Sequence, residues 1–308
     1  MLHIATKSLS AVPGQRPDDF GKADIMMNKR VSSNDAYLVI MVVSSIRPQD
    51  SAVRAAIRDT WFSFAEKHSD VICRFIVGAA KMSSSQKRDF SRREPDVVML
   101  HDIADDYNSL TSKVLAGFIW FHSNYNFRFL LKVDDDSFVV LPSLLKFVRQ
   151  HEATHGFERT YMGYFDGRAR VKTYGKWSES DWSLCDLYLP HALGGGYILS
   201  SDLIAFLATN FSLLKRYANE DIAVGTWLAG LDINYVHSTD FDTEFVSRGC
   251  SNSYLITHKR SPMAMKELFG NVKRYGNLCG LYETTNRGSY EYNWNVPPSK
   301  CCIRSPVN

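Results

Sequence analysis

FLLKVDDDSFVVLP, residues 129–142, places three consecutive aspartates between two apolar runs. The first run is typical of a buried strand, and the second of a strand or turn beneath the same sheet. Three carboxylates at the end of a buried strand repel one another unless a cation lies among them. Asp134, Asp135 and Asp136 therefore indicate a site for Mg²⁺, Mn²⁺ or Ca²⁺, which prefer oxygen ligands. A solvated acidic turn, or a helix cap ahead of Ser143, is the alternative that this stretch leaves open.

The residues before this stretch alternate between strand and helix patterns. Apolar runs predict strands at 37–45, 71–78 and 96–100, and helical periodicity predicts helices at 51–68, at 84–93 and from residue 108 or 109. Three strand–helix repeats that lead into a fourth strand predict an α/β fold with a mostly parallel, doubly wound sheet. Such sheets commonly bind nucleotides at the carboxyl ends of their strands.

Neither glycine-rich phosphate motif, G-x-G-x-x-G or G-x-x-x-x-G-K-[ST], is present. A nucleotide would therefore have to be held by a carboxylate-bound metal and by basic side chains. Arg54 and Arg58 are expected near the carboxyl edge of the first strand, where arginines suit a diphosphate. Lys113 falls in the first turns of a later helix, where an anionic ligand would be near. Two solvated helix arginines are the simpler interpretation of Arg54 and Arg58.

Aromatic residues in a polar setting distinguish the second half of the chain. They are Trp177, Trp182 and Tyr188. Exposed aromatics beside charged residues are typical of platforms on which sugars stack, and the alternative is a core beneath a loop. Gly194-Gly195-Gly196 permits a close backbone approach to a ligand, or merely a tight turn.

Asn219 is predicted to cap a helix that carries Glu220 and Asp221 in its first turn. The helix dipole alone favours acids there, so a purely structural role is also open. A late strand, residues 254–258, ends in His258.

Composition excludes some functions and suggests a compartment. The net charge of +3, without a block of Lys or Arg, gives no reason to expect nucleic acid as a partner. No segment has the roughly 18 apolar residues of a membrane span, and residues 1–35 are predicted to be a disordered lead-in without a signal sequence. Four of the six cysteines fall within the last 60 residues, which favours an oxidising lumen. Asn210-Phe211-Ser212 is a glycosylation sequon and points the same way.

The cysteine positions lead to a specific expectation. Cys73 lies in a predicted core strand, so we expect a buried free thiol there. We expect Cys279 to pair with Cys301 or Cys302 and close the tail into a loop. Five cysteines beside Cys73 is an odd number, so at least one more should be unpaired within the chain.

Six motifs together resemble one known family. They are RAAIRDTW (54–61), DDYNSLTSK (105–113), FLLKVDDDSFV (129–139), ALGGGYILS (192–200), NEDIAVG (219–225) and ITHKRSPMAM (256–265). In this order, over most of residues 36–302, the chain resembles the β-1,3-galactosyltransferases of glycosyltransferase family 31. WSLCDLYLPHALGGGY, DTEFVSRGCSNSYLITHK and PPSKCC carry a closer likeness to members that act on the glycosaminoglycan linkage region.

The resemblance implies a GT-A fold in a single catalytic domain, with UDP-galactose as donor and Mn²⁺ as cofactor. Galactose would be transferred with inversion, in β-1,3 linkage, to the galactose of a galactosyl-xylosyl-serine on proteoglycan core proteins. The domain would span residues 36–302, as a nucleotide-binding half (36–142), an acceptor half (143–276) and a wrapping tail (277–302), before a C-terminal end at 303–308. A type II membrane protein facing the Golgi lumen is implied as well, although the expected anchor is not seen in this sequence.

Residue roles follow from the same resemblance. Asp136 and His258 would bind the metal, with His237 as a fallback, and Asp134 would position the ribose or a metal-bound water. Asp221 would be the general base, with Glu220 orienting sugar hydroxyls. The implied nucleotide-sugar contacts are Ser44, Ser45, Arg47, Arg54, Asp106, Lys113, Asp134 and Asp135, and the acceptor would border Trp177, Gly194, Gly195 and Gly196.

Three other functions stay open at this point. The first is a related β-1,3-N-acetylglucosaminyltransferase. The second is a metal-dependent phosphotransferase with an aspartate nucleophile, which would leave the aromatic stretch and the Glu220-Asp221 helix unexplained. The third is a non-catalytic, metal-dependent module that binds galactosides without consuming UDP-galactose.

Overall fold

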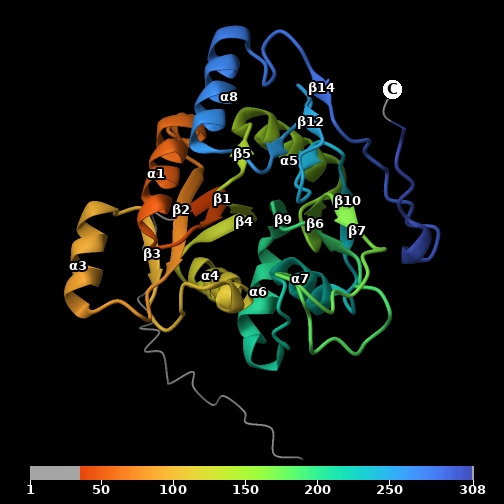
Figure 1. The fold of residues 1–308 in the computed structure, drawn as a ribbon, viewed down its shortest axis with the longest axis horizontal. Helices are drawn as coiled ribbons and strands as arrows, with labels where there is room; N and C mark the ends of the chain where they lie inside the picture. Colours follow the sequence, from red (N-terminus) through yellow and green to blue (C-terminus); the bar gives the residue numbers. More distant parts are fainter. Residues whose placement is uncertain (1–34, 307–308) are drawn as a thin grey trace, which may run out of the picture.

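A seven-stranded sheet forms the centre of the molecule in the computed structural model, which describes residues 35–306 (Figure 1). Its strand order is β10-β6-β9-β4-β1-β2-β3. The strands are β1 (Asp35–Val43), β2 (Val71–Gly78), β3 (Val97–Leu100), β4 (Asn126–Asp134), β6 (Thr160–Gly163), β9 (Gly196–Ser200) and β10 (Asn234–His237). All neighbours are parallel except β9, which is antiparallel to both β4 and β6. The predicted α/β class with a mostly parallel, Rossmann-like sheet is confirmed.

Helices cover both faces of this sheet (Figure 1). One face carries α1 (Pro48–Ile57), α5 (Leu141–His155) and α8 (Pro262–Tyr275), and the other carries α4 (Leu110–Asn124), α6 (Ser201–Thr209) and α7 (Glu220–Leu228). α3 (Ser84–Arg93) lies at the β3 edge. The chain order β1-α1-β2-α3-β3-α4-β4 is the predicted series of three repeats that lead into a fourth strand. A continuous apolar core, with β1 and β4 almost fully buried, joins the two halves.

Short strands beyond the main sheet bring distant loops together. β11 (Phe241–Asp242), β13 (Ile256–Thr257) and β5 (Phe138–Val139) form a three-stranded sheet in that order. The two-stranded pairs are β7 (Phe165–Asp166) with β8 (His191–Ala192), and β12 (Gly249–Cys250) with β14 (Thr284–Thr285). Short helical turns are η1 (Arg58–Phe62, a π-helix), α2 (Ser63–Ala65), η2 (Tyr107–Ser109), η3 (Phe211–Leu213) and η4 (Pro298–Lys300).

The helix predicted at residues 51–68 is interrupted. α1 ends at Ile57, and a π-helical turn follows in which Thr60 leaves helical dihedral angles (φ −117°, ψ −107°). The Thr60 hydroxyl donates a hydrogen bond to the carbonyl of Ala56 at 2.6 Å. Such side-chain bonding to the preceding turn bends helices, and the apolar periodicity of the sequence does not reveal it.

The predicted pairing of Cys279 with Cys301 or Cys302 is wrong. Cys279 pairs with Cys250, and Cys301 pairs with Cys302. The reason is the antiparallel pairing of β12 with β14, which carries the segment after Cys279 alongside Cys250. Cys73 is free as predicted, although only partly buried, and Cys185 is a second free and exposed thiol.

The sequence predicted no membrane-spanning segment and a disordered lead-in at residues 1–35. Between residues 35 and 306, the helices are too short or too polar to cross a membrane. The predicted lead-in, residues 1–35, lies outside the described residues except for Asp35, which begins β1.

Candidate functional site

Asp134, Asp136 and His258 form a cluster in which one ligand atom from each lies within 4.8 Å of the others. The Nε2 atom of His258 is 2.8 Å from Asp136 Oδ1 and 3.6 Å from Asp134 Oδ2. The cluster forms because β13 pairs antiparallel with β5. The residue that follows β13 therefore lies beside the residues that precede β5. Asp136 precedes β5, and His258 follows β13.

The His258 ring is oriented for metal binding. Its Nδ1 lies 3.1 Å from the backbone carbonyl of Glu244, to which it donates its hydrogen, so Nε2, which faces the carboxylates, is the nitrogen that would bind a cation. The ring packs so closely on Gly195 that a Cβ there would lie 2.6 Å from Nδ1. Two carboxylates and one imidazole with a fixed outer partner are a donor set that fits a divalent metal.

Without a metal, the same contacts favour a protonated His258. Burial lowers its pKa, but hydrogen bonds with Asp134 and Asp136 outweigh burial and raise the pKa to about 9. A bound cation would replace this proton between the carboxylates. Lys259 occupies part of the same space, with Nζ 2.9 Å from Asp136 Oδ2, and would have to move.

His237, the fallback ligand, has both ring nitrogens engaged by the backbone. Its Nδ1 accepts a hydrogen bond from the Phe165 N–H at 3.1 Å, and its Nε2 lies 2.9 Å from the Tyr290 carbonyl. Burial lowers the pKa of His237 to about 4, as expected for a neutral ring inside the fold. This geometry favours His258 over His237 as the metal ligand.

A buried lysine that sequence reasoning missed joins the metal cluster to helix α7. The Nζ atom of Lys132 is 2.8 Å from Asp134 Oδ1 and 2.6 Å from the Gly194 carbonyl, and it also forms an ion pair with Glu220. Burial opposes its charge, but Asp134 and Glu220 outweigh burial and raise the pKa of Lys132. Strand alternation could have revealed it, because residues 132 and 134 share one side of β4.

The two acids of α7 occupy different environments. Glu220 is buried, with one oxygen paired with Lys132 and the other accepting the Tyr197 hydroxyl at 2.9 Å. Burial, only partly offset by Lys132, raises the pKa of Glu220 to about 7. Asp221 is half-buried, and its Oδ2 accepts the Gly194 N–H at 3.0 Å. Asp221 is thus the more exposed of the two acids, and contact of either acid with a sugar stays a prediction.

At the carboxyl end of β1, the predicted nucleotide contacts form a hydrogen-bonded group. The Ser44 hydroxyl donates to Asp135 at 2.7 Å, and the Lys113 ammonium donates to the Ser44 carbonyl at 3.0 Å. Burial raises the pKa of Asp135 to about 7. Asp105, which sequence reasoning did not select, pairs with Lys113 and accepts the Ile46 N–H at 2.5 Å. Asp105 thereby holds the β1–α1 loop.

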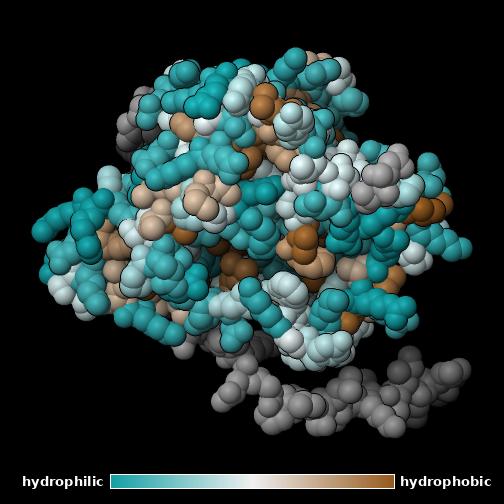
Figure 2. All heavy atoms as spheres, turned by 45° about the horizontal axis from the view of Figure 1, so that its top comes forward, coloured by the Kyte–Doolittle hydropathy of each residue, from teal (hydrophilic) through white to brown (hydrophobic). Residues whose placement is uncertain are grey.

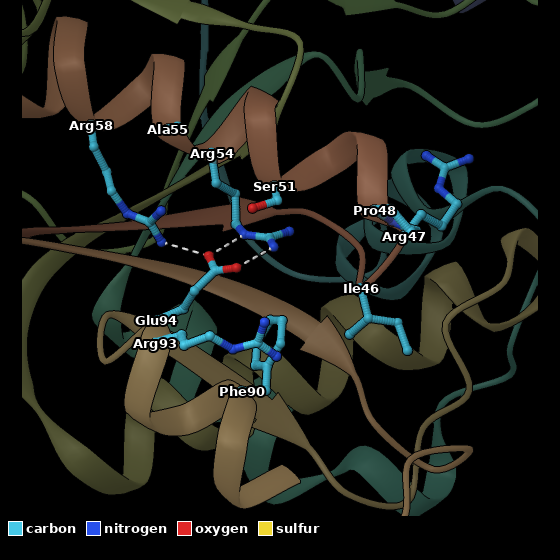
Figure 3. A pocket seen from close by; sticks show the side chains of 10 residues that line it. All are labelled: Ile46, Arg47, Pro48, Ser51, Arg54, Ala55, Arg58, Phe90, Arg93 and Glu94. Atoms are coloured by element: carbon cyan, nitrogen blue, oxygen red, sulfur yellow. Dashed lines mark hydrogen bonds and ion pairs between the residues drawn. The ribbon is translucent and has the colours of Figure 1, made fainter. Parts of the chain in front are cut away.

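Arg54 and Arg58 point into a cavity of about 440 Å³ beside this loop (Figure 3). The Arg54 guanidinium is 1% exposed and contacts both Glu94 oxygens at 2.6 Å, and Arg58 also reaches Glu94. The charge of Arg54 is therefore largely neutralised by Glu94. Arg47 points away from the Glu94 carboxylate in Figure 3 and is the more accessible arginine of this group.

Four of the predicted site residues have local structural roles. Ser45 and Arg47 both bond to Asp50 in the first turn of α1. Asp106 caps the turn η2 by accepting the Ser109 N–H at 3.0 Å. Asn210, in the sequon, ends α6 and donates to the Phe206 carbonyl at 2.9 Å.

The aromatic stretch is partly core and partly exposed. Tyr188 is 3% exposed and packs against Trp182, as in the core alternative. Trp177 is 45% exposed, and its carbonyl accepts a hydrogen bond from the Asn219 side chain at 3.1 Å. Trp182 is half-buried, so Trp177 is the most exposed of the three.

Comparison with known proteins adds one decisive observation. The model of the galactosyltransferase family matches residues 52–239. The chain belongs to this family. The matched residues include the Asp134–Asp136 segment and Asp221, and they end before His258.

Among its relatives, this galactosyltransferase is 42% identical over 274 residues to β-1,3-galactosyltransferase 6 of Mus musculus, which covers 87% of this chain and 83% of the mouse protein. It is 32% identical over 184 residues to UDP-GalNAc:β-1,3-N-acetylgalactosaminyltransferase 2 of Xenopus laevis, with 60% of this chain and 36% of that protein covered. A solved structure of 4-diphosphocytidyl-2C-methyl-D-erythritol synthase matches 66% of this chain and 89% of its own, with a TM-score of 0.37 and 10% identity.

Proposed function

We propose that this galactosyltransferase transfers galactose from UDP-galactose, in β-1,3 linkage and with inversion, to the galactose of galactosyl-xylosyl-serine on proteoglycan core proteins. The observation that carries the proposal is the link between the metal cluster and Asp221. Lys132 contacts Asp134 on one side and the Gly194 carbonyl on the other, and the Gly194 N–H binds Asp221. The likeness to the mouse protein supports the sugar and the linkage.

The donor would be held at the carboxyl ends of β1 and β4. Asp134, Asp136 and His258 would bind Mn²⁺, which, when bound, offsets the negative charge that gathers on a leaving diphosphate. Arg47 lines the cavity of Figure 3, and its side chain donates a hydrogen bond to the Ser45 hydroxyl in the same β1–α1 loop, which Ser44 begins. We assign the nucleoside end of UDP-galactose to this side, with the diphosphate at the cluster.

Asp221 would act as the general base. Its carboxylate is fixed by the backbone N–H groups of Gly194 at 3.0 Å and Ile222 at 2.9 Å, which leave lone pairs on both oxygens for a sugar hydroxyl. As the acceptor 3-hydroxyl attacks the anomeric carbon, its proton passes to Asp221. The bond from that carbon to the UDP oxygen breaks on the opposite face. One carboxylate is sufficient for such a single inversion.

The compartment proposed is the Golgi lumen. The Cys250–Cys279 disulfide supports an oxidising environment, and the Asn210 sequon fits passage through the secretory pathway. Glycosidase treatment of protein made in animal cells should shift its mass, and Asn210→Gln should abolish the shift.

A product analysis tests the proposal. The purified protein is incubated with Mn²⁺, galactosyl-xyloside and, in parallel, UDP-galactose, UDP-N-acetylglucosamine or UDP-N-acetylgalactosamine. We expect one product, from UDP-galactose, with a β-1,3 linkage. Preferred use of an N-acetylated donor would replace this proposal with a related transferase. Galactoside binding without any transfer would favour the sugar-binding module.

A further inference from the structure

Two exposed aromatic side chains from separate loops contact each other. Trp177 is 45% exposed and Phe245 is 60% exposed, and their ring centroids lie 6.3 Å apart at an interplanar angle of 61°. Small apolar patches are scattered over the mostly hydrophilic face in Figure 2, and a lone exposed apolar residue needs no explanation. A pair of large rings in edge-to-face contact is different, because together they offer apolar faces to a ligand.

One ring is attached near the candidate base, Asp221, and the other near the metal ligand His258. The Trp177 carbonyl is bound by Asn219, two residues before Asp221. Phe245 directly follows Glu244, whose carbonyl orients the metal ligand His258. Trp177 is thus attached on the side of the base, and Phe245 on the side of the metal. Both rings are more exposed than the half-buried Asp221.

A basic side chain lies near the face of each of these rings. The Lys176 ammonium lies 5.9 Å from the Trp177 ring centroid and 4.9 Å from that of Tyr107, whose hydroxyl donates to Asn219 at 3.2 Å. The Arg287 guanidinium lies 5.7 Å from the Phe245 centroid and is tied to Glu244 at 3.5 Å. Because cation–π contacts of this kind restrain a ring, the aromatic faces are preorganised.

We propose that Trp177 and Phe245 form a subsite for the second sugar of the acceptor, the pyranose that carries the reacting galactose. This inference rests on the function proposed above. The reacting hydroxyl must reach Asp221 beside Gly194, so the sugar next to it lies farther out, where the two rings are. The C–H faces of a pyranose pack on aromatic rings, and in a galactosyl-xyloside this sugar is the xylose.

Two acceptors separate the subsite from the catalytic machinery. Transfer from UDP-galactose is measured with methyl β-galactoside, which has one sugar, and with galactosyl-xyloside, which has two. The unmodified protein should show a KM about tenfold lower for the disaccharide, the scale of one buried aromatic contact. In Phe245→Ala and Trp177→Ala this advantage should disappear, and in Phe245→Ala the kcat, the UDP affinity and the KM for methyl β-galactoside should stay unchanged. Phe245→Tyr should retain the preference.

Tyr275→Ala is the matched control, because Tyr275 is 43% exposed but ends α8, a 14-residue helix about 21 Å long that starts four residues after His258. It should keep the preference. An unmodified protein that uses both acceptors equally would overturn the subsite and leave the proposed function standing. A protein inactive on both would refute the proposed function itself. Phe245→Ala and Trp177→Ala variants that lose UDP binding as well would assign these rings a structural role and overturn the subsite.

Discussion

The Nδ1 atom of His258 lies 3.1 Å from the backbone carbonyl oxygen of Glu244. The Glu244 side chain is only 4% exposed, and Arg304, Arg248 and Arg287 all pair with it. Arg304 comes from the end of the chain and also donates to the Gly288 carbonyl at 2.7 Å. Arg304, in the C-terminal segment, therefore helps to fix the Glu244 residue whose carbonyl orients the His258 ring.

Arg304→Gln should weaken metal binding without unfolding the protein. Loss of the Arg304–Glu244 pair frees the loop that carries the carbonyl partner of His258, and such outer partners typically affect metal affinity by about 10- to 100-fold. Electron paramagnetic resonance of free Mn²⁺ gives the affinity. Arg149→Gln, which removes an exposed ion pair with Asp70, is the control. Equal Mn²⁺ affinity in the folded Arg304→Gln variant and the unmodified protein would contradict this connection.

Asp136→Asn should abolish the effect of Mn²⁺ on UDP binding. Asp136 contributes a carboxylate oxygen 2.8 Å from His258 Nε2, and an amide is a weaker ligand for a hard cation. Calorimetry of UDP with and without Mn²⁺ measures this, and we expect the variant to bind UDP in Mn²⁺ as weakly as the unmodified protein does without it. If the unmodified protein binds UDP equally well in both conditions, the metal bridge is wrong.

Asp221→Asn should lose activity while keeping the fold and the donor site. The amide oxygen can still accept the Gly194 N–H, so the free energy of unfolding should change by about 1 kcal/mol or less. Loss of a general base should lower the transfer rate by roughly 10²- to 10⁴-fold. Asp202→Asn, which changes another acid in a first helical turn, should leave the rate unchanged. Near-normal transfer by a UDP-binding Asp221→Asn protein would rule Asp221 out as the base and make Glu220 the next candidate.

Glu94→Gln should destabilise the protein in a pH-dependent manner. Arg54, 1% exposed, would lose its partner, and breaking a buried ion pair typically costs about 3–5 kcal/mol. Hydrogen bonds from Arg54 hold the pKa of Glu94 at about 2, below its ordinary 4.5. The stabilisation is therefore fully present above pH 4.5 and declines as the pH falls toward 2. Urea unfolding at pH 6 and pH 3 measures it. A stability difference between variant and unmodified protein that is the same at both pH values would refute this assignment.

Local patterns predicted much of the first half of the fold. α3 runs from Ser84 to Arg93, as the sequence indicated, because a capping box at Ser83 fixes its start. The cluster of Asp136 with His258 could be expected only through the family resemblance. Its physical cause is the pairing of two-residue strands, which leaves no periodicity to detect. The same limit explains the wrong pairing for Cys279.

The ion pair that neutralises Arg54 could not be predicted for a different reason. Its position near the carboxyl edge of β1 was predicted correctly, but its ion partner, Glu94, lies 40 residues away, after α3. Sequence patterns place a charge on an element and do not show whether another charge already neutralises it. Lys132 was missed for a related reason: alternation along β4 puts it on the side of Asp134, but its other ion partner, Glu220, lies 88 residues away.

Each aspartate at the end of β4 has its own partner: Asp134 binds Lys132, Asp135 binds Ser44, and Asp136 binds His258. Three adjacent aspartates thus contact three different neighbours. Which neighbour each one contacts is set by its distance in residues from the end of β4. Losing or gaining one residue between Lys132 and Asp134 would shift all three carboxylates relative to these neighbours. Engineers who vary this enzyme can therefore exchange side chains here one at a time, but the length of the segment has to be left alone.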